Sequence, residues 1–281
     1  MKRLRIYLYS GLFLMLSVFF TLLIAILSEK STINKYINPI GQLPILGPAI
    51  ASFLLILFSR KKNFSNLNFF KFNISILLKI IGVFIIFNII VTITQLIFGN
   101  IVYEPNNIPK ELFNIQFPNS VYILITCFLT IFYAGFGEEI GWRGFLFNKL
   151  NTLPYLEMTL LLNIVWALWH LPMFILGGMG HGNIVFSFVL FTITCLEFGI
   201  LLNYIRIKTN SVFGAIFLHP FANICGFISL GIFRIDNEFW AGHSNIISIL
   251  ILLPFSIYYY LEGKKLYNIK NSTFNNQILK Q

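Results

Sequence analysis

Two adjacent carboxylates and an arginine interrupt an otherwise apolar part of the chain, in the stretch GEEIGWRG at residues 137–144. An ionisable side chain in a membrane segment costs about 2.5–3.5 kcal/mol on insertion scales, so such residues indicate a site or a buried ion pair. On a helix, Glu139 and Arg143 are four residues apart and share a face, which predicts an ion pair between them. Glu138 points about 100° away from Glu139 and is left for another role.

Two further apolar stretches carry polar pairs with the same four-residue spacing. Trp166 precedes His170 in one, and His219 precedes Asn223 in the other, so each pair can face one cavity. We estimate the depth of each residue in the membrane from its separation along the chain from the nearest charged residue expected at the interface, at about 1.5 Å per residue. Glu138 and His219 then lie about 16 Å deep, and His170 lies about 20 Å deep. This similar depth predicts that the three motifs converge.

A pair of glycines with small-xxx-small spacing, Gly137 and Gly141, surrounds the glutamates. Such pairs let neighbouring membrane helices approach closely. We expect this close approach to bring His170 and His219 within reach of Glu138.

One glutamate, two histidines and an asparagine together fit the activation of water. A carboxylate assisted by a histidine can act as a general base, and a second histidine with an amide can stabilise the oxyanion formed at a peptide carbonyl. The donors Glu138, His170 and His219 can equally hold a zinc ion with an open position, although asparagine is a poor zinc ligand. The residues themselves leave both alternatives open.

Other mechanisms of membrane proteases lack the residues that they need. Asp236 is the only aspartate, and the chain has neither an H-E-x-x-H nor a G-x-S-x-G motif. The chemistry is therefore that of glutamate and histidine, or there is none. We expect the isolated Glu197 either to pair with Arg206 or to line the cavity.

The composition indicates a membrane protein. Of the 281 residues, 57% are hydrophobic and only 11% are charged, against about 25% charged in soluble domains. We predict an all-α bundle of about eight transmembrane helices, because eight apolar segments can each span about 30 Å of hydrocarbon. These segments are 6–28, 41–59, 74–98, 119–148, 157–177, 183–205, 211–232 and 240–262.

The net charge of +10 follows from membrane topology and does not indicate nucleic-acid binding. With both termini in the cytoplasm, fifteen of the twenty Lys and Arg residues fall in cytoplasmic segments, as the positive-inside rule requires. We divide the chain into three N-terminal helices with their loops (1–118), a catalytic core (119–235), and a last helix with a cytoplasmic tail (236–281).

At these motifs the chain resembles the CAAX prenyl endopeptidase and bacteriocin-processing family, also called the Abi or type II CAAX protease family. The family pattern is E-E-x-x-x-R, then aromatic-x-x-x-H, then H-x-x-x-N or D, on parts of an eight-helix bundle. The second motif usually begins with Phe, so Trp166 is a departure that we expect to affect packing and not chemistry.

The resemblance implies hydrolysis of a peptide bond within the membrane. Family members are described as metalloproteases and as glutamate proteases without metal; we favour the metal-free form, with zinc as the alternative. By analogy, the roles are Glu138 as the base, His170 as the residue that positions the water, His219 and Asn223 as the oxyanion site, and Glu139 with Arg143 as their support.

The expected substrate is a membrane-associated peptide or protein. The abundance of Ile, Asn, Lys and Phe suggests an AT-rich bacterial genome, which places the protein in a bacterial plasma membrane. The resemblance then implies a role in bacteriocin immunity or peptide-pheromone maturation. The rival hypotheses are a non-catalytic immunity or scaffold protein that binds a partner in the bilayer and, with less support, a small transporter. The oligomeric state is left open.

Overall fold

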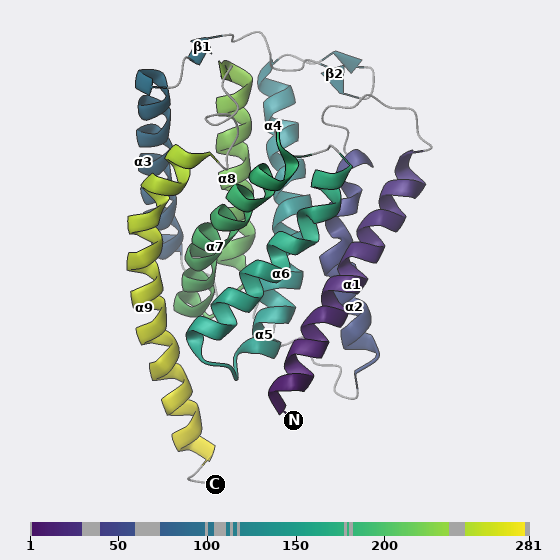
Figure 1. Cartoon of the computed structure of the whole chain (residues 1–281), viewed down its shortest axis with the longest axis vertical. Helices are drawn as coiled ribbons and strands as arrows, with labels where there is room; N and C mark the ends of the chain where they lie inside the picture. Colours follow the sequence, from purple (N-terminus) through teal and green to yellow (C-terminus); the bar gives the residue numbers. More distant parts are fainter. Residues whose placement is uncertain are drawn as a thin grey trace.

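The computed structural model describes residues 2–29, 40–59, 74–98, 101–103, 111–112, 115–116, 119–176, 179, 182–235 and 245–278. Within these ranges the chain forms a bundle of helices with short strands at one end (Figure 1). Its helices are α1 (Lys2–Glu29), η1 (Ile40–Leu46), α2 (Gly47–Leu57), α3 (Ile74–Phe98), α4 (Asn119–Thr130), η4 (Ile131–Glu138), η5 (Ile140–Leu146), α5 (Phe147–Leu150), α6 (Tyr155–Ile175), α7 (Ile184–Thr209), α8 (Phe213–Ile232) and α9 (Ile246–Ile278).

Two short antiparallel strand pairs join loops in the described part of the chain. Strand β1 (Ile101–Tyr103) pairs with β4 (Phe233–Ile235), and β2 (Glu111–Leu112) pairs with β3 (Ile115–Gln116). Asp236 lies outside the described residues.

The predicted all-helical membrane architecture is confirmed, and each of the eight apolar segments contains helix. Five described helices are long and apolar enough to cross a membrane, and two shorter apolar helices cover 43–57 and 213–225. The start of α1 and the end of α9 lie at the same end of the bundle (Figure 1), as an even number of crossings requires. The five long spans are Arg3–Leu27, Ile74–Thr94, Tyr155–Ile175, Ile184–Thr209 and Ile246–Lys270.

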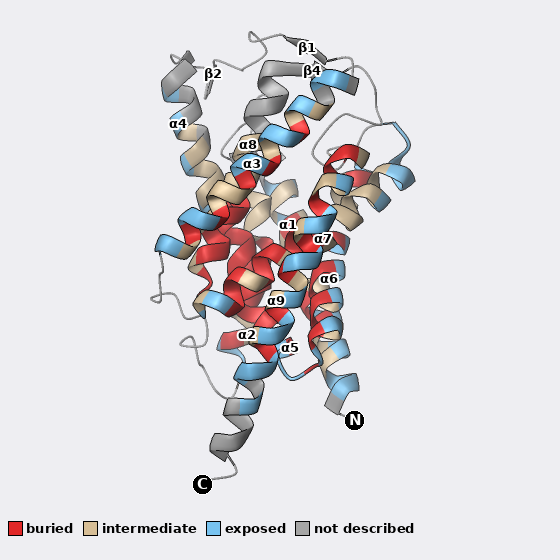
Figure 2. Ribbon diagram, turned by 90° about the vertical axis from the view of Figure 1, so that its left-hand side faces the viewer, coloured by how far each residue is buried: buried red, intermediate tan, exposed pale blue. Residues whose placement is uncertain are grey.

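Buried residues concentrate in the middle of the bundle (Figure 2). The outer helix α3 shows the contrast: Phe84 and Phe87 are buried, whereas Ile85, Ile86 and Ile89 are exposed. A helix that is apolar on every side suits a membrane, because lipid can cover the exposed face. The main cluster of buried hydrophobic residues draws most on α6 and α7 and also includes residues of α3, η5 and α9.

The two glycines of the small-xxx-small pair do bring another element close. A Cβ atom on Gly137 would lie 2.8 Å from the carbonyl oxygen of Ile45, and one on Gly141 would lie 2.6 Å from the Cβ atom of Pro48. The predicted close approach is confirmed, but its partners are η1 and α2. These are not the helices that carry the two histidines.

Other glycines bring the histidine-bearing helix α8 and its neighbours to the centre. A Cβ atom on Gly135 would collide with the carbonyl oxygen of Ile216, three residues before His219. A Cβ atom on Gly199 in α7 would collide with the side chain of Asn163 in α6. Backbone contact at these positions sets the spacing of the helices that surround the glutamates.

The helix that carries the glutamates changes its geometry at the motif. Both η4 and η5 are π-helical, and the N–H of Phe147 bonds to the carbonyl oxygen of Trp142, five residues earlier. Turns of this type are rare, usually single, and often found at functional sites. Glu138 is the last residue of η4, and Glu139, whose N–H bonds to the carbonyl oxygen of Gly135 four residues earlier, separates the two π-helical segments.

Candidate active site

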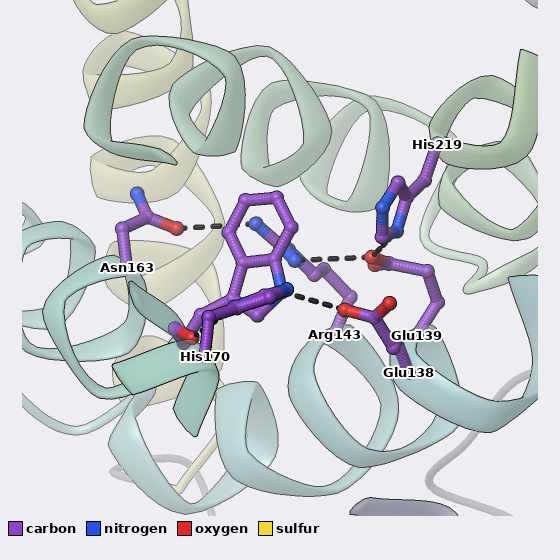
Figure 3. Close-up of polar contacts among 7 residues, drawn as sticks. Glu138, Glu139, Arg143, Asn163, His170 and His219 are labelled. Carbon is purple, nitrogen blue, oxygen red and sulfur yellow. Dashed lines mark hydrogen bonds and ion pairs between the residues drawn. The ribbon is translucent and has the colours of Figure 1, made fainter. Parts of the chain in front are cut away.

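Glu139 is the fully buried anion at the centre of the cluster. Its Oε1 atom accepts a hydrogen bond from Arg143 Nη1 at 3.0 Å, which confirms the predicted ion pair. The same oxygen lies 2.7 Å from His219 Nδ1 (Figure 3). Both Glu139 and Arg143 are 0% exposed. A buried carboxylate requires such partners, because desolvation of an unpaired charge is very unfavourable.

Arg143 is held from several directions. Its Nη2 atom donates to Asn163 Oδ1 at 3.1 Å, and its guanidinium carbon lies 4.4 Å from the ring centre of Trp166. Arg206 Nε donates to the backbone oxygen of Arg143 at 3.0 Å. These contacts from α6 and α7 keep the cation of the Glu139 ion pair in one place.

Glu138 has different surroundings from its neighbour. Its Oε2 atom accepts a hydrogen bond of 2.7 Å from the indole Nε1 of Trp166 (Figure 3). The residue is 4% exposed and interacts electrostatically with His219, Glu139 and Arg143. Its hydrogen bond from Trp166 thus comes from a neutral donor, whereas Glu139 is bonded to a cation.

The hydrogen bonds of the two histidines determine which ring nitrogens are available. His170 Nδ1 lies 2.9 Å from the carbonyl oxygen of Trp166, and since a carbonyl can only accept, we assign the proton to Nδ1. His219 Nδ1 faces the carboxylate of Glu139, which accepts a hydrogen bond, so we place a proton on this nitrogen as well. In both rings Nε2 is left for substrate or water.

Asn223 is placed differently from the other residues expected at the site. It is exposed in α8, whereas His219, one turn earlier, is buried. Among the described residues, no hydrogen bond joins Asn223 to the cluster. The structure thus brings together five of the six expected residues, namely Glu138, Glu139, Arg143, His170 and His219.

The set of zinc donors considered from the sequence does not fit the described arrangement. Among the residues that the structure describes, no group of three or more His, Cys, Asp or Glu side chains is placed to hold a metal ion. We therefore derive no step through a metal.

Sequence reasoning missed two polar contributions from α6, those of Asn163 and the Trp166 side chain. Asn163, Trp166 and His170 have the spacing i, i+3 and i+7, which places them on one face of a helix. The spacing was therefore a usable signal for Asn163. The indole hydrogen bond to Glu138 shows that replacing Phe by Trp affects more than packing.

Glu197 and Arg206 point in different directions. Nine residues apart on α7, they lie on opposite faces of the helix, and Arg206 bonds to Arg143 and Asn148. Glu197 is buried, and its Oε2 atom has no hydrogen-bond partner. A pair between Glu197 and Arg206 is not formed, and a place for Glu197 beside the cavity stays a prediction.

The fold and the cluster together define a multi-pass helical membrane protein with a buried Glu–His–Arg centre. Residues 120–225 match the family model of the Rce1-like type II CAAX prenyl endopeptidases. The chain is also 28% identical over 213 residues to CAAX prenyl protease 2 of Methanococcus maripaludis, a likeness that covers 71% of this chain and 76% of that protein. The resemblance to the CAAX protease family is confirmed by these two matches, and residues 120–225 contain all three motifs.

Proposed function

We propose that this protein is an intramembrane endopeptidase in which Glu138 activates a water molecule against a peptide bond. One observation carries the proposal: two adjacent buried carboxylates have divided roles. Glu139 is bonded to Arg143 and His219, whereas Glu138 is bonded through one oxygen to a neutral indole. Glu139 Oε2 also has no hydrogen-bond partner, but its carboxylate is paired with the Arg143 cation, so the second oxygen of Glu138 is the better proton acceptor.

In the proposed reaction, water is held between Glu138 and His170. The unprotonated Nε2 atom of His170 accepts a hydrogen bond from the water, and Glu138 accepts the proton that the water loses as its oxygen attacks the carbonyl carbon. The C–N bond then breaks, and Glu138 returns the proton to the leaving amine. The peptide bond is then hydrolysed, and the enzyme is back in its starting state.

His219 supplies the complementary charge in this mechanism. Its Nδ1–H is directed at Glu139, so donation from Nε2 to the oxyanion requires the doubly protonated ring. The carboxylate of Glu139 stabilises that imidazolium, and a donor fixed before the reaction stabilises the transition state without reorganisation. Asn223, one turn along α8, is proposed as a second donor once substrate is bound.

The proposed substrate is a membrane-associated peptide or protein. The relative from Methanococcus maripaludis is named CAAX prenyl protease 2, and we extend to this chain only the cleavage of a peptide at the membrane. In a bacterial plasma membrane, such an enzyme would serve bacteriocin immunity or peptide-pheromone maturation.

The decisive experiment measures cleavage of a quenched membrane-peptide library by the purified protein in nanodiscs. Glu138→Gln is expected to lower kcat by about 10²–10⁴, the usual contribution of a general base, and His219→Ala should also abolish detectable cleavage. Glu262→Gln is the control, since Glu262 bonds to Lys265 at the surface. Cleavage is expected to persist in chelator; loss in chelator with rescue by zinc would overturn the metal-free step.

Two results would contradict the catalytic proposal. One is a Glu138→Gln protein that cleaves at the wild-type rate. The other is a folded Glu138→Gln protein that retains full activity in a cellular assay of peptide immunity, because a scaffold that works by binding needs no base.

A further inference from the structure

Trp166 lies at the centre of the buried cluster. Its ring centroid is 5.2 Å from that of His219 and 5.9 Å from that of His170. The Arg143 guanidinium carbon lies 4.4 Å from the same ring, on its face, and the indole nitrogen bonds to Glu138. One side chain thus contacts four of the residues expected at the site.

Two different groups of Trp166 reach the two residues that would hold the water. The side-chain Nε1–H donates to Glu138 Oε2 at 2.7 Å, and the backbone oxygen lies 2.9 Å from His170 Nδ1. The first bond fixes the rotation of the Glu138 carboxylate, and the second fixes the tautomer and orientation of the His170 ring. The position of Trp166 therefore determines the geometry between Glu138 and His170.

The indole N–H is suited to this task because it is neutral. A hydrogen bond to a charged carboxylate is stronger than one between neutral groups, so it can select one carboxylate orientation. A lysine or arginine at the same place would form an ion pair and weaken Glu138 as a base. A phenylalanine would keep the aromatic contacts with His170 and His219 but could not hold the carboxylate.

The indole itself has little freedom to move. It is 4% exposed, and Arg143, which lies against its ring, is held by Glu139 and Asn163. A cation on the face of a tryptophan is a favourable contact, more so when water is excluded. The direction of the N–H bond is thereby fixed before any substrate arrives.

We propose that Trp166 is a positioning residue for the base: its indole N–H holds Oε2 of Glu138, so that Oε1 faces the water held by His170. This inference rests on the proposed function. It assigns to the side chain at this position a polar role that the aromatic ring alone does not provide.

The kinetic test compares Trp166→Phe with Trp142→Phe. Both substitutions remove a buried indole, but Trp142 Nε1 makes no hydrogen bond, so this control loses ring volume without losing a hydrogen bond. We expect Trp166→Phe to lower kcat about 10–100-fold, the usual effect of a residue that orients a reacting group, with KM nearly unchanged. An unchanged kcat in Trp166→Phe would overturn the proposal.

A second variant separates the lost hydrogen bond from any loss of packing. Replacing Trp166 with 3-benzothienylalanine keeps a bicyclic ring of nearly the same shape and puts sulfur where the N–H was. The same fall in kcat is expected, although the ring keeps its volume and its packing. A wild-type kcat in this isosteric protein would show that the N–H does not position the base.

A spectroscopic measurement tests the contact without any substrate. The chain has four tryptophans, so indole ¹⁵N labelling gives few signals, and Trp→Phe variants assign them. The Trp166 indole proton should lie downfield of that of Trp142 and move upfield in Glu138→Ala. If the chemical shift of the Trp166 indole proton does not change in Glu138→Ala, the inference is overturned. If the shift does change but the wild-type protein cleaves no peptide, the contact is upheld and the proposed function is refuted.

Discussion

The helix that carries the glutamates and two outer helices, α1 and α3, differ in how closely their glycines meet neighbouring elements. At Gly135, Gly137 and Gly141 in η4 and η5, an added Cβ atom would collide with the backbone or side chains of other helices. At Gly11 in α1 and Gly82 in α3, nothing lies within 4 Å of such an atom. The centre therefore depends on close shape complementarity, whereas the outer helices depend on apolar character.

The polar side chains of the two regions show the same difference. In the outer helices, Ser10 donates to the carbonyl oxygen of Ile6, and Asn88 donates to that of Phe84, so each is satisfied within its own helix. At the centre, hydrogen bonds join different helices, as between Arg143 and Asn163. A substitution at the centre therefore leaves a buried partner without its hydrogen bond, whereas a substitution in an outer helix does not.

The largest expected difference in stability between the two regions comes from Glu139→Gln. Removing this charge leaves Arg143 buried without its anion, and breaking a buried ion pair from one side costs about 3–5 kcal/mol. The matched change in an outer helix is Asn88→Leu, expected to cost less than about 1 kcal/mol. The free energy of unfolding of both variants in the same detergent checks the prediction.

An equal loss of stability in Glu139→Gln and Asn88→Leu would show that the centre is no more dependent on its charges than the outer helices are. Glu139→Gln should also abolish cleavage, because the His219 imidazolium loses its counter-charge. Full activity in this variant would contradict the role given to His219.

A smaller effect is expected from adding one methyl group to a glycine. Gly141→Ala places a Cβ atom 2.6 Å from that of Pro48, and overpacking of this kind costs about 1–3 kcal/mol. Gly82→Ala meets nothing within 4 Å and should stabilise α3 by about 0.5–1 kcal/mol, since alanine favours a helix interior. Thermal unfolding of the two proteins should therefore shift in opposite directions; shifts of the same sign would contradict the comparison.

The sequence was sufficient to predict what depends on local spacing and hydrophobicity. The eight helical segments followed from runs of apolar residues long enough to span a bilayer, and the Glu139–Arg143 pair followed from the i, i+4 rule. Both are found in the structure. Such features need only the neighbouring residues in the chain, which is why the sequence alone predicts them.

Features that depend on contact between helices could not be predicted from the sequence. The π-helical geometry of η4 and η5 is not encoded in a periodicity rule, and the partners of Gly137 and Gly141 proved to be η1 and α2. The bond from Trp166 to Glu138 joins residues 28 positions apart. No spacing rule predicts which of two adjacent glutamates an indole will reach.

Thr21 lies in the outer helix α1, but its side chain bonds to residues of other helices. It therefore gives the test with the smallest expected effect on stability. Its hydroxyl accepts from Trp169 Nε1 at 2.9 Å and donates to the carbonyl oxygen of Pro44 at 3.0 Å. Hydrogen bonds between membrane helices contribute about 0.6 kcal/mol each, so Thr21→Val should lower the free energy of unfolding by about 1 kcal/mol and leave kcat unchanged.

The matched control for Thr21→Val is Ser10→Ala, which removes a hydroxyl bonded only within the turn of α1 as described. We expect no measurable change in the free energy of unfolding for Ser10→Ala. If both variants lose the same stability, the contacts of α1 with Trp169 and Pro44 contribute nothing beyond apolar packing. A loss confined to Thr21→Val would show that specific interhelical bonding extends outwards from the site, through Trp169 beside His170, as far as the first helix.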